Sequence, residues 1–428
     1  MALPVGAAAL IQTLYLWNVH RTIYHNGDAV FYDAQARLIT QGHWFINPYD
    51  LAWKGVVTPS ASHPPLTSLA LAAADELGAM SWTWHMVVMA GLFVITVLVS
   101  GLVGRELAGE RAGVVAALLV ATYPYLWVNP GAVLAETIAV LVAALLLWAA
   151  LRFLRRPHWP VAAEVGVYLG LAVLSRSELL LLVVLIGIPL IVLVRGISRE
   201  ARLKYLGVMG LALAVVIGPW VGRNMTAFHH PEYLSTQGGV TLATANCDTT
   251  YYGSDIGWWS FNCDVAKVGP GADESDIDKV ERHVGEAYIR SHAGRFVEVM
   301  AVRVLRVWDL YRPIQQAHFD QSDARPGWVS EVGMVYFYAL VPGALYGAVV
   351  GRRRRVPLFA VVALVLTATL AAALFFANGR YRAEGDLGVV LLAAVGIDAV
   401  IHRGNGRAGR GRPARGLADL HPPFQPLS

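Results

Sequence analysis

Charged residues are scarce in this chain. Only 15% of its 428 residues are Asp, Glu, Lys or Arg, whereas 56% are hydrophobic, and the mean hydropathy is +0.49. Soluble domains carry about 25% charged and about 45–50% apolar residues, so the composition excludes an ordinary soluble globular protein. Apolar runs of roughly 18 residues recur along the sequence, which predicts an all-α polytopic membrane protein.

Several common catalytic motifs are also missing. The sequence contains no G-x-x-x-x-G-K-[ST], no H-E-x-x-H and no G-x-S-x-G, which argues against P-loop, zinc-protease and α/β-hydrolase chemistry. His229 and His230 show no consistent metal-ligand pattern and are interpreted as loop residues. No cleavable signal peptide is expected, since no basic region precedes the short first apolar run; we expect the true translation start a few residues upstream of Met1.

The apolar runs predict about ten transmembrane helices, at 2–19, 83–103, 112–128, 132–151, 161–175, 178–195, 205–221, 331–350, 356–376 and 386–402. Just over half of all Lys and Arg lie in alternate connections between these helices. These basic residues are Arg105 and Arg111; Arg152, Arg155 and Arg156; Arg195, Arg199, Arg202 and Lys204; Arg352 to Arg355; and those of the tail from Arg403.

The positive-inside rule places these connections and both termini in the cytoplasm. The exterior then receives two long segments, 21–82 and 222–330. We divide the chain into an N-terminal membrane module, 1–221, an exterior cap, 222–330, C-terminal membrane helices, 331–402, and a basic tail, 403–428, which we expect to be disordered. The Arg-rich composition fits a GC-rich bacterial genome, so we expect a bacterial plasma membrane. Membrane lipids are expected partners, and nucleic acid is not.

The first exterior segment predicts two interfacial helices. Asp28 is placed to N-cap a helix that runs through Thr40, with Asp33 and Arg37 as an i,i+4 pair on its surface. Phe31, Ala34 and Leu38 form the expected apolar stripe of this helix. The motif "SHPPL", Ser62 to Leu66, then starts a second helix over 66–77.

Cysteine occurs only twice, at Cys247 and Cys263 in the second exterior segment. An even number of cysteines confined to the oxidising side predicts a disulfide, and two free thiols are the alternative. A bridge that closes this loop would contribute about 3 kcal/mol in the chain-entropy model. A helical pattern returns over 275–310, although too few periodic strands are visible to predict an independent domain.

Two carboxylates lie near the exterior ends of apolar helices. Asp28 follows the first span by roughly one turn, and its alternative role is the helix N-cap. Glu136 lies about one turn inside the span that starts near Gly131, where the helix dipole would tolerate a carboxylate. Ionisable residues at membrane depth usually face a cavity and mark a functional path, so both are candidate site residues.

Arginines occupy two short exterior turns. In "LSRSELL", Arg176 either pairs with Glu178 or binds an anion. In "NGRYR", Arg380 and Arg382 bracket Tyr381 on the side where positive charge is not expected, which favours phosphate or carboxylate binding. Together with His63, these residues predict one exterior cavity that suits an anionic lipid-linked donor, with a carboxylate ready to deprotonate an acceptor hydroxyl.

An ordered set of segments resembles the polytopic GT-C glycosyltransferases. The nearest group is the bacterial family 39-like branch, related to protein O-mannosyltransferases and lipid A aminoarabinose transferases. The resemblance runs through "GDAVFYDAQARLITQGHWFINPYD", "SHPPL", "LAETIAVLVAALLLW", "GLAVLSRSELLLL", "GPWVGRNMTAF" and "NGRYRAEGDLGVVLLAA". It covers most of the chain in the expected order, and it implies inverting transfer of a sugar from a polyprenyl-phosphate donor on the exterior face.

The resemblance also implies roles for single residues. By position, Asp28 matches the catalytic base. The donor phosphate is assigned to a basic group made up of His63, Arg176, Arg380 and Arg382. Acceptor binding or site organisation is assigned to Glu136, Asp33 and Tyr381. The family often has a second acidic residue where this chain has Ala29, which puts a two-carboxylate or metal-binding version of the site in doubt. No cofactor is assigned, and a divalent metal is left as an open alternative.

The sequence therefore predicts a membrane glycosyltransferase whose acceptor is a protein, a lipid or a polysaccharide. A transporter or flippase of a lipid-linked sugar would use the same basic cavity without chemistry. The long exterior segments and the lack of detectable inverted repeats argue against that alternative. A degenerate relative that serves as a scaffold in envelope assembly is a third reading, and the intact set of Asp28, His63, Arg176 and Arg380 argues against it.

Overall fold

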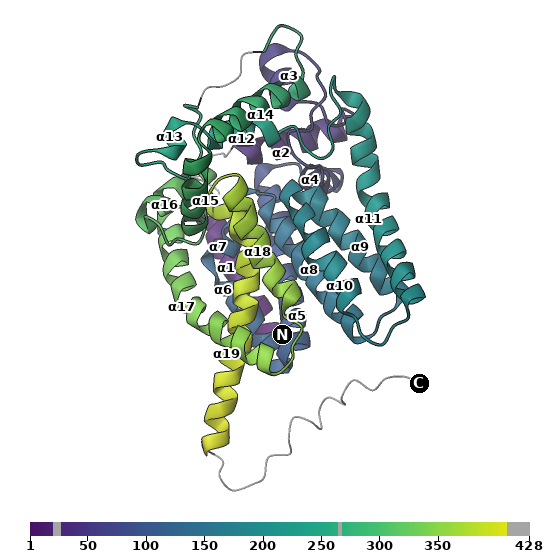
Figure 1. Ribbon diagram of the computed structural model, residues 1–428, viewed down its shortest axis with the longest axis vertical. Coiled ribbons are helices and arrows are strands. Elements are labelled where there is room, and N and C mark those ends of the chain that lie inside the picture. The colour runs from purple at the N-terminus through teal and green to yellow at the C-terminus, as the bar shows by residue number, and fades with distance from the viewer. Residues whose placement is uncertain (20–26, 264–267, 409–428) are drawn as a thin grey trace.

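The computed structural model describes residues 1–19, 27–263 and 268–408, with side chains up to His402. A bundle of long helices forms its lower part, and shorter helices form a cap above it (Figure 1). Within the described residues, the only β-pairing is an isolated bridge between Ile46 and Pro59. The bundle comprises α1 (Ala2–Val19), α5 (Trp82–Ala108), α6 (Glu110–Thr122), α8 (Glu136–Arg155), α9 (Trp159–Ser175), α10 (Ile188–Leu193), α11 (Arg199–Ala227), α17 (Gly327–Arg353), α18 (Phe359–Leu374) and α19 (Ala383–Ala408).

Each predicted span coincides with helical structure, and the chain is a multi-pass membrane protein. Six helices in the described part are long and apolar enough to cross a membrane, and a seventh span results if the helices at 110–122 and 124–132, which meet at 61°, form one crossing. Three further apolar helices have only 10–17 residues, at 159–175, 177–193 and 359–374. The number of ten crossings stays a prediction.

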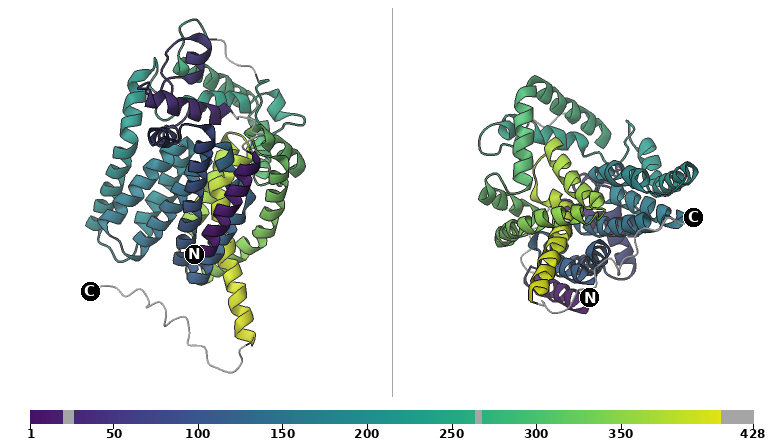
Figure 2. Two further views of the ribbon diagram at one scale, coloured as in Figure 1. Left: turned by 180° about the vertical axis from the view of Figure 1, so that it is seen from behind. Right: turned by 60° about the horizontal axis from the view of Figure 1, so that its bottom comes forward.

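The sequence predicts that the basic connections lie at one end of the helices and the two long segments at the other, and the contacts agree with this arrangement. Arg155, the last residue of α8, pairs with Glu106 in the last turn of α5, and the hydroxyl of Tyr205 donates to the carbonyl of Pro157 at 3.2 Å. These basic connections therefore lie together, at the end opposite the cap (Figure 2). Helix α19 continues to Ala408, so the first residues of the predicted tail are helical, and 409–428 lie outside the described residues.

The first exterior segment forms α2 (Gly27–Thr40), α3 (Pro48–Lys54) and α4 (Leu66–Glu76). The predicted N-cap at Asp28 is wrong by position, because the helix already includes Gly27 and Asp28 lies within its first turn. The predicted apolar stripe is also rotated. Because α2 packs against α4 and the bundle rather than lying free, its buried side chains are Ala29, Phe31, Tyr32, Gln35, Ala36 and Ile39.

The second exterior segment forms the rest of the cap. Its helices are α12 (Gly238–Ala245), α13 (Asp248–Tyr251), α14 (Glu274–Ser291), α15 (Ala293–Val307) and α16 (Pro313–Phe319). The helical pattern predicted at 275–310 is divided at His292 between α14 and α15. A disulfide joins Cys247 and Cys263, whose Cα atoms are 5.6 Å apart.

Glycines allow α19 to lie close against α17. A Cβ atom on Gly347 would lie 1.9 Å from the carbonyl oxygen of Leu392, and one on Gly396 would lie 2.2 Å from that of Gly343. Small residues at such crossings let helix backbones approach closely inside a membrane. This packing fixes α19, whose exterior end carries the turn with Arg380 and Arg382.

Candidate active site

Five predicted site residues from distant parts of the sequence meet at the end of the bundle that carries the cap. Each comes from a different place in the fold. They are Asp28 in the first turn of α2, His63 in the turn before α4, Glu136 at the first position of α8, Arg176 directly after α9, and Arg380 in the 3₁₀ turn η5 (Gly379–Arg382) before α19.

Arg380 is the centre of this group. Its guanidinium forms an ion pair with Asp28, and it lies 3.4 Å from a carboxylate oxygen of Glu136 and 3.6 Å from one of Asp323. The side chain is 10% exposed. The backbone N–H of Arg380 donates to the side chain of Asn378 at 2.9 Å, and this cap shapes the turn that aims the guanidinium at Asp28.

Arg176 lies beside Arg380 and shares its carboxylate. The Nη1 atom of Arg176 donates to Glu136 at 2.5 Å, and Nε donates to Glu178 at 2.7 Å. The sequence left open whether Arg176 pairs with Glu178 or binds an anion, and the pair is present. The ring of Tyr381 lies 4.4 Å from the guanidinium of Arg176 and 5.4 Å from that of Arg380, so it contacts both cations.

His63 packs against α2 beside Asp28. Its Nε2 atom is 3.7 Å from a carboxylate oxygen of Asp28, and its ring contacts Phe31 and Tyr32 at centroid distances of 4.9 and 5.0 Å. Burial lowers the pKa of His63 and outweighs the attraction of Asp28, while Arg380 lowers it further. At neutral pH the imidazole is therefore mostly uncharged and offers an N–H donor rather than a full positive charge.

The carboxylate of Asp28 is held in its ionised form. Burial is the largest single influence and would raise its pKa, but the charge and hydrogen bond of Arg380, together with His63 and Arg176, outweigh burial, and the pKa is lowered to about 2. The side chain is 29% exposed, so it is open to a second reactant. An ionised, partly exposed carboxylate in contact with a guanidinium is the arrangement from which a base and an anion site can be built.

Arg382 does not join this group, and its predicted place beside Arg380 needs correction. Its guanidinium donates to Asp386 at 3.1 Å, to Asp309 at 2.7 Å and to the hydroxyl of Tyr123 at 3.2 Å. The side chain is 1% exposed. In a 3₁₀ turn, residues two positions apart differ by about 240° around the helix axis, so Arg380 and Arg382 point in different directions.

Asp33 also lies apart from Asp28, on the next turns of α2. It pairs with Arg37 at 3.1 Å, as the sequence predicts, and its other oxygen lies 2.8 Å from Nδ1 of His85. The contact with His85 was not predicted, because nothing in the sequence spacing brings α2 to α5.

Two further acidic residues belong to the surroundings of the site and were missed. Asp323 reaches Arg380, and burial raises its pKa although Arg380 opposes the shift. The carboxylate of Glu274 accepts from the side chains of Asn47, Ser62 and Thr236 and from the backbone N–H of Ala61, at 2.7–3.0 Å. Glu274 thus ties the second exterior segment to the turn that carries His63.

A divalent metal does not fit the residues around Asp28. The guanidinium of Arg380 already occupies the position between the carboxylates of Asp28, Glu136 and Asp323 and balances their charge. A second cation there would face two arginines at short range, which electrostatic repulsion opposes.

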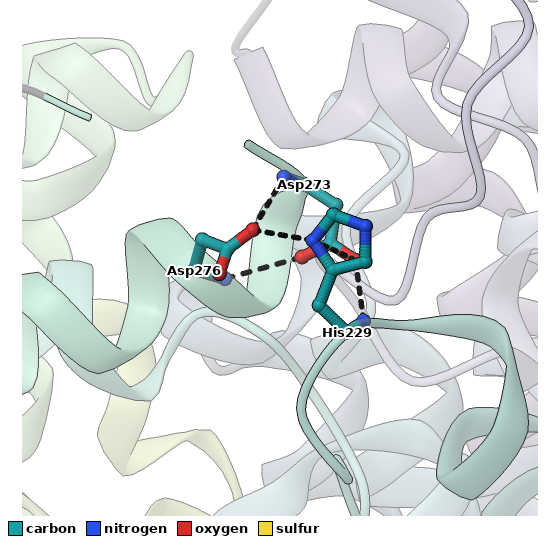
Figure 3. A group of neighbouring side chains, drawn as sticks. All are labelled: His229, Asp273 and Asp276. Carbon is teal, nitrogen blue, oxygen red and sulfur yellow. Dashed lines mark hydrogen bonds and ion pairs between the residues drawn. The ribbon is translucent and has the colours of Figure 1, made fainter. Parts of the chain in front are cut away.

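One other group in the described part of the chain has metal-ligating side chains in reach of one another. His229, Asp273 and Asp276 bring ligand atoms within 4.8 Å, with Nδ1 of His229 2.7 Å from Asp276 (Figure 3). His229 is interpreted from the sequence as a loop residue, and its proximity to Asp273 and Asp276 was not predicted. Asp273 and Asp276 accept backbone N–H groups at the N-terminus of α14, so helix capping accounts for their proximity, and we derive no catalytic step from them.

The comparisons with known proteins agree with this architecture. The family model of dolichyl-phosphate-mannose-protein mannosyltransferases matches residues 62–221. Curated protein sequences give no match. The oligosaccharyltransferase AglB from Archaeoglobus fulgidus, solved with an inhibitory peptide and a dolichol-phosphate, aligns with 100% of this chain and 52% of its own at 14% identity and a TM-score of 0.55.

The chain has the fold of the GT-C glycosyltransferases.

A second AglB structure, tethered to an acceptor peptide with the sequon NVT, aligns with 94% of this chain and 50% of its own at 15% identity and a TM-score of 0.56. ArnT from Cupriavidus metallidurans, solved with undecaprenyl phosphate, aligns with 97% of this chain and 81% of its own at 16% identity and a lower TM-score of 0.42. This chain spans about half the length of AglB, and at these identities the likeness concerns the fold.

Proposed function

We propose that this protein is a membrane glycosyltransferase that moves a sugar from a polyprenyl-phosphate donor to an acceptor hydroxyl on the exterior side of the membrane. The observation that carries the proposal is the direct contact between the partly exposed carboxylate of Asp28 and the guanidinium of Arg380. A sugar phosphate ester needs a base at the acceptor and a cation at the leaving phosphate, and these two groups are adjacent here.

The reaction is a single displacement with inversion at the anomeric carbon. The acceptor oxygen attacks this carbon, its proton passes to a carboxylate oxygen of Asp28, and the bond between the anomeric carbon and the phosphate oxygen breaks. The electron pair of that bond stays with polyprenyl phosphate. Arg380 and Arg176 stabilise the negative charge that grows on the leaving phosphate, and neutral His63 donates an N–H to it.

The ion pair explains how a carboxylate with a pKa of about 2 can act as a base. When the donor phosphate binds, Arg380 must divide its charge between the phosphate and Asp28. The positive charge that stabilises the ionised carboxylate of Asp28 is then smaller, so the proton affinity of Asp28 rises. Donor binding thus prepares the base, and no divalent metal takes part in the step at Asp28.

Asp28→Asn tests the proposal, since the amide keeps the shape of the side chain but cannot accept a proton. We expect release of polyprenyl phosphate from a synthetic polyprenyl-phospho-sugar to fall by about 10²–10⁴-fold in purified, lipid-reconstituted protein. Asp50→Asn is the matched control and should keep full activity, because the carboxylate of Asp50 on α3 pairs with Lys54 of the same helix and with Thr58 in the loop that follows.

Near-normal release by the Asp28→Asn protein would refute the base assignment. The same assay separates an enzyme from a carrier. An enzyme yields free polyprenyl phosphate in proportion to glycosylated acceptor, whereas a flippase leaves the donor intact and only moves it across the vesicle membrane.

A further inference from the structure

A buried histidine bridges three helices close to the site. His85, in the first turn of α5, places Nδ1 2.8 Å from Asp33 on α2 and Nε2 2.8 Å from Asp75 on α4. The side chains of His85 and Asp75 are 0% exposed, and that of Asp33 is 16% exposed. We call Asp33, His85 and Asp75 the histidine clasp. None of its members contacts Asp28, Arg176 or Arg380 directly in the described structure.

The protons of the clasp follow from its geometry. Each ring nitrogen faces a carboxylate oxygen at 2.8 Å, but a neutral imidazole has only one N–H donor. Its other nitrogen would then meet the lone pairs of an oxygen at short range. An imidazolium carries positive charge toward both carboxylates: Nε2–H donates to Asp75, and Nδ1 makes an ion-pair contact with Asp33 without a hydrogen bond.

The charges of the clasp also balance. Arg37, on the same helix as Asp33, pairs with that carboxylate at 3.1 Å. Two carboxylates, one imidazolium and one guanidinium sum to zero. A buried group of charges is tolerated only when it is paired in this way, and removal of one member leaves an uncompensated charge.

The clasp acts on the helix that carries Asp28. Asp33 follows Asp28 by five residues, which is about 7.5 Å along a helix axis. Near its N-terminus α2 is held by the hydroxyl of Tyr49, which donates to the carbonyl of Gly27 at 2.5 Å. The clasp holds the next turn against α4 and α5, so the two contacts together fix the rotation and the depth of α2.

We propose that His85, as an imidazolium, is a positioning residue that locks α2 between α4 and α5 and so sets the carboxylate of Asp28 at the reacting acceptor. This inference rests on the proposed role of Asp28 as the base. It assigns to Asp33 an organising role at a distance from the reaction, through His85, rather than a contact with substrate.

The proposal predicts an alkaline limb in the activity profile. When His85 loses its proton, one carboxylate contact is lost and α2 gains freedom. The charged groups in contact with the imidazole are Asp33 from α2 and Asp75 from α4, and Arg37 pairs with Asp33. Glu76 lines, together with Arg37 and Asp75, one cavity at the edge of the clasp. A variant that removes a neighbouring negative charge should therefore move this limb to lower pH, because the imidazolium loses a partner.

Asp75→Asn is the milder test, and His85→Gln is the stronger one. Both should lower kcat for sugar transfer by about tenfold or more while the KM for the donor stays within about twofold, since Arg176 and Arg380 keep their contacts. Asp75→Asn should also shift the alkaline limb to lower pH. Asp50→Asn removes a carboxylate that is paired with Lys54 on α3 and serves as the control that changes neither quantity.

A merely structural role would reduce the yield of folded protein and its Tm without changing kcat per folded molecule or the alkaline limb, and that result would overturn the proposal.

Melting curves of Asp33→Asn, Asp75→Asn and the double variant test the clasp without any activity assay. We expect the double variant to lose less than the sum of the single losses, since each single change already breaks the clasp. Additive losses of Tm in the double variant would contradict the existence of the clasp as one unit. If Asp28→Asn stays active while the melting losses are non-additive, the base assignment fails and the clasp remains.

Discussion

Arg380 and Arg382 lie two residues apart on either side of Tyr381, yet their surroundings differ. Arg380 meets carboxylates of three separate elements, and within the described structure its buried Nε makes only an ion-pair contact, 3.4 Å from Glu136, and no hydrogen bond. Arg382 donates from Nε, Nη1 and Nη2 to fixed partners, and its guanidinium lies between the rings of Tyr125 and Phe337 at 4.3 and 4.4 Å.

The two guanidinium groups differ in how many N–H donors they have available for a substrate. Arg382 commits four of its five N–H donors to fixed partners, and these contacts join η5 to α19, to Tyr123 and to the chain around Asp309. Arg380 sits at the partly exposed side of Asp28 and has a nitrogen without a hydrogen bond. An arginine that binds substrate needs such spare capacity, and an arginine that holds the fold needs the opposite.

The largest expected effect comes from breaking the fixed arginine. Arg382→Gln leaves Asp309 and Asp386 as buried carboxylates without their cation, and such a loss costs about 3–5 kcal/mol. We expect a large drop in Tm and in the yield of folded protein, measured by thermal unfolding in detergent. A stable Arg382→Gln protein that loses only activity would show that Arg382 serves the reaction instead.

Arg380→Gln should have the opposite profile. The donor phosphate loses a charge-assisted contact of about 1.5–3 kcal/mol, which corresponds to roughly 10–150-fold in kcat/KM for the donor. The fold should be affected less than in Arg382→Gln, because Asp28 is partly exposed and can be hydrated. Steady-state kinetics at varied donor concentration, together with Tm, measure both quantities. Equal melting losses in the two variants would remove the distinction between the arginines.

A smaller effect concerns the pKa of His63, which Arg380 helps to lower together with burial. Since the unfolded chain binds a proton at this histidine more readily than the folded chain does, stability is lost as pH falls through the ordinary value of about 6.5. We expect this acid-side loss, measured as the Tm difference between proteins with His63 and with His63→Gln from pH 8 to pH 5.5, to shrink in Arg380→Gln. It should not change in Arg382→Lys, which keeps its charge far from the imidazole.

Much of the architecture follows from local patterns. Apolar runs locate the helices of the bundle, and the positions of basic residues sort the connections between its two ends, because both depend on composition over short stretches. Asp28, Glu136, Arg176 and Arg380 could be selected as one group because charged residues next to apolar helices are costly and therefore few.

What escaped prediction depends on contacts between distant segments. Nothing in "NGRYR" distinguishes Arg380 from Arg382, since the direction of each depends on the 3₁₀ turn and on Asp309 and Asp386. The prediction rotated the buried face of α2 because it treated the helix as a free interfacial one, whereas α2 packs against α4 and buries Tyr32 and Ile39. Glu274 and His85 were missed for the same reason, because their partners lie on other elements.

The ion pair between Asp28 and Arg380 joins residues 352 positions apart. During synthesis Asp28 is made long before Arg380, so the carboxylate has no guanidinium partner until the intervening residues have been added. The reaction centre is therefore completed only when α19 is in place. A chain truncated before η5 would carry the proposed base without Arg380 and would be unable to use a donor, so the proposed activity depends on both segments being present.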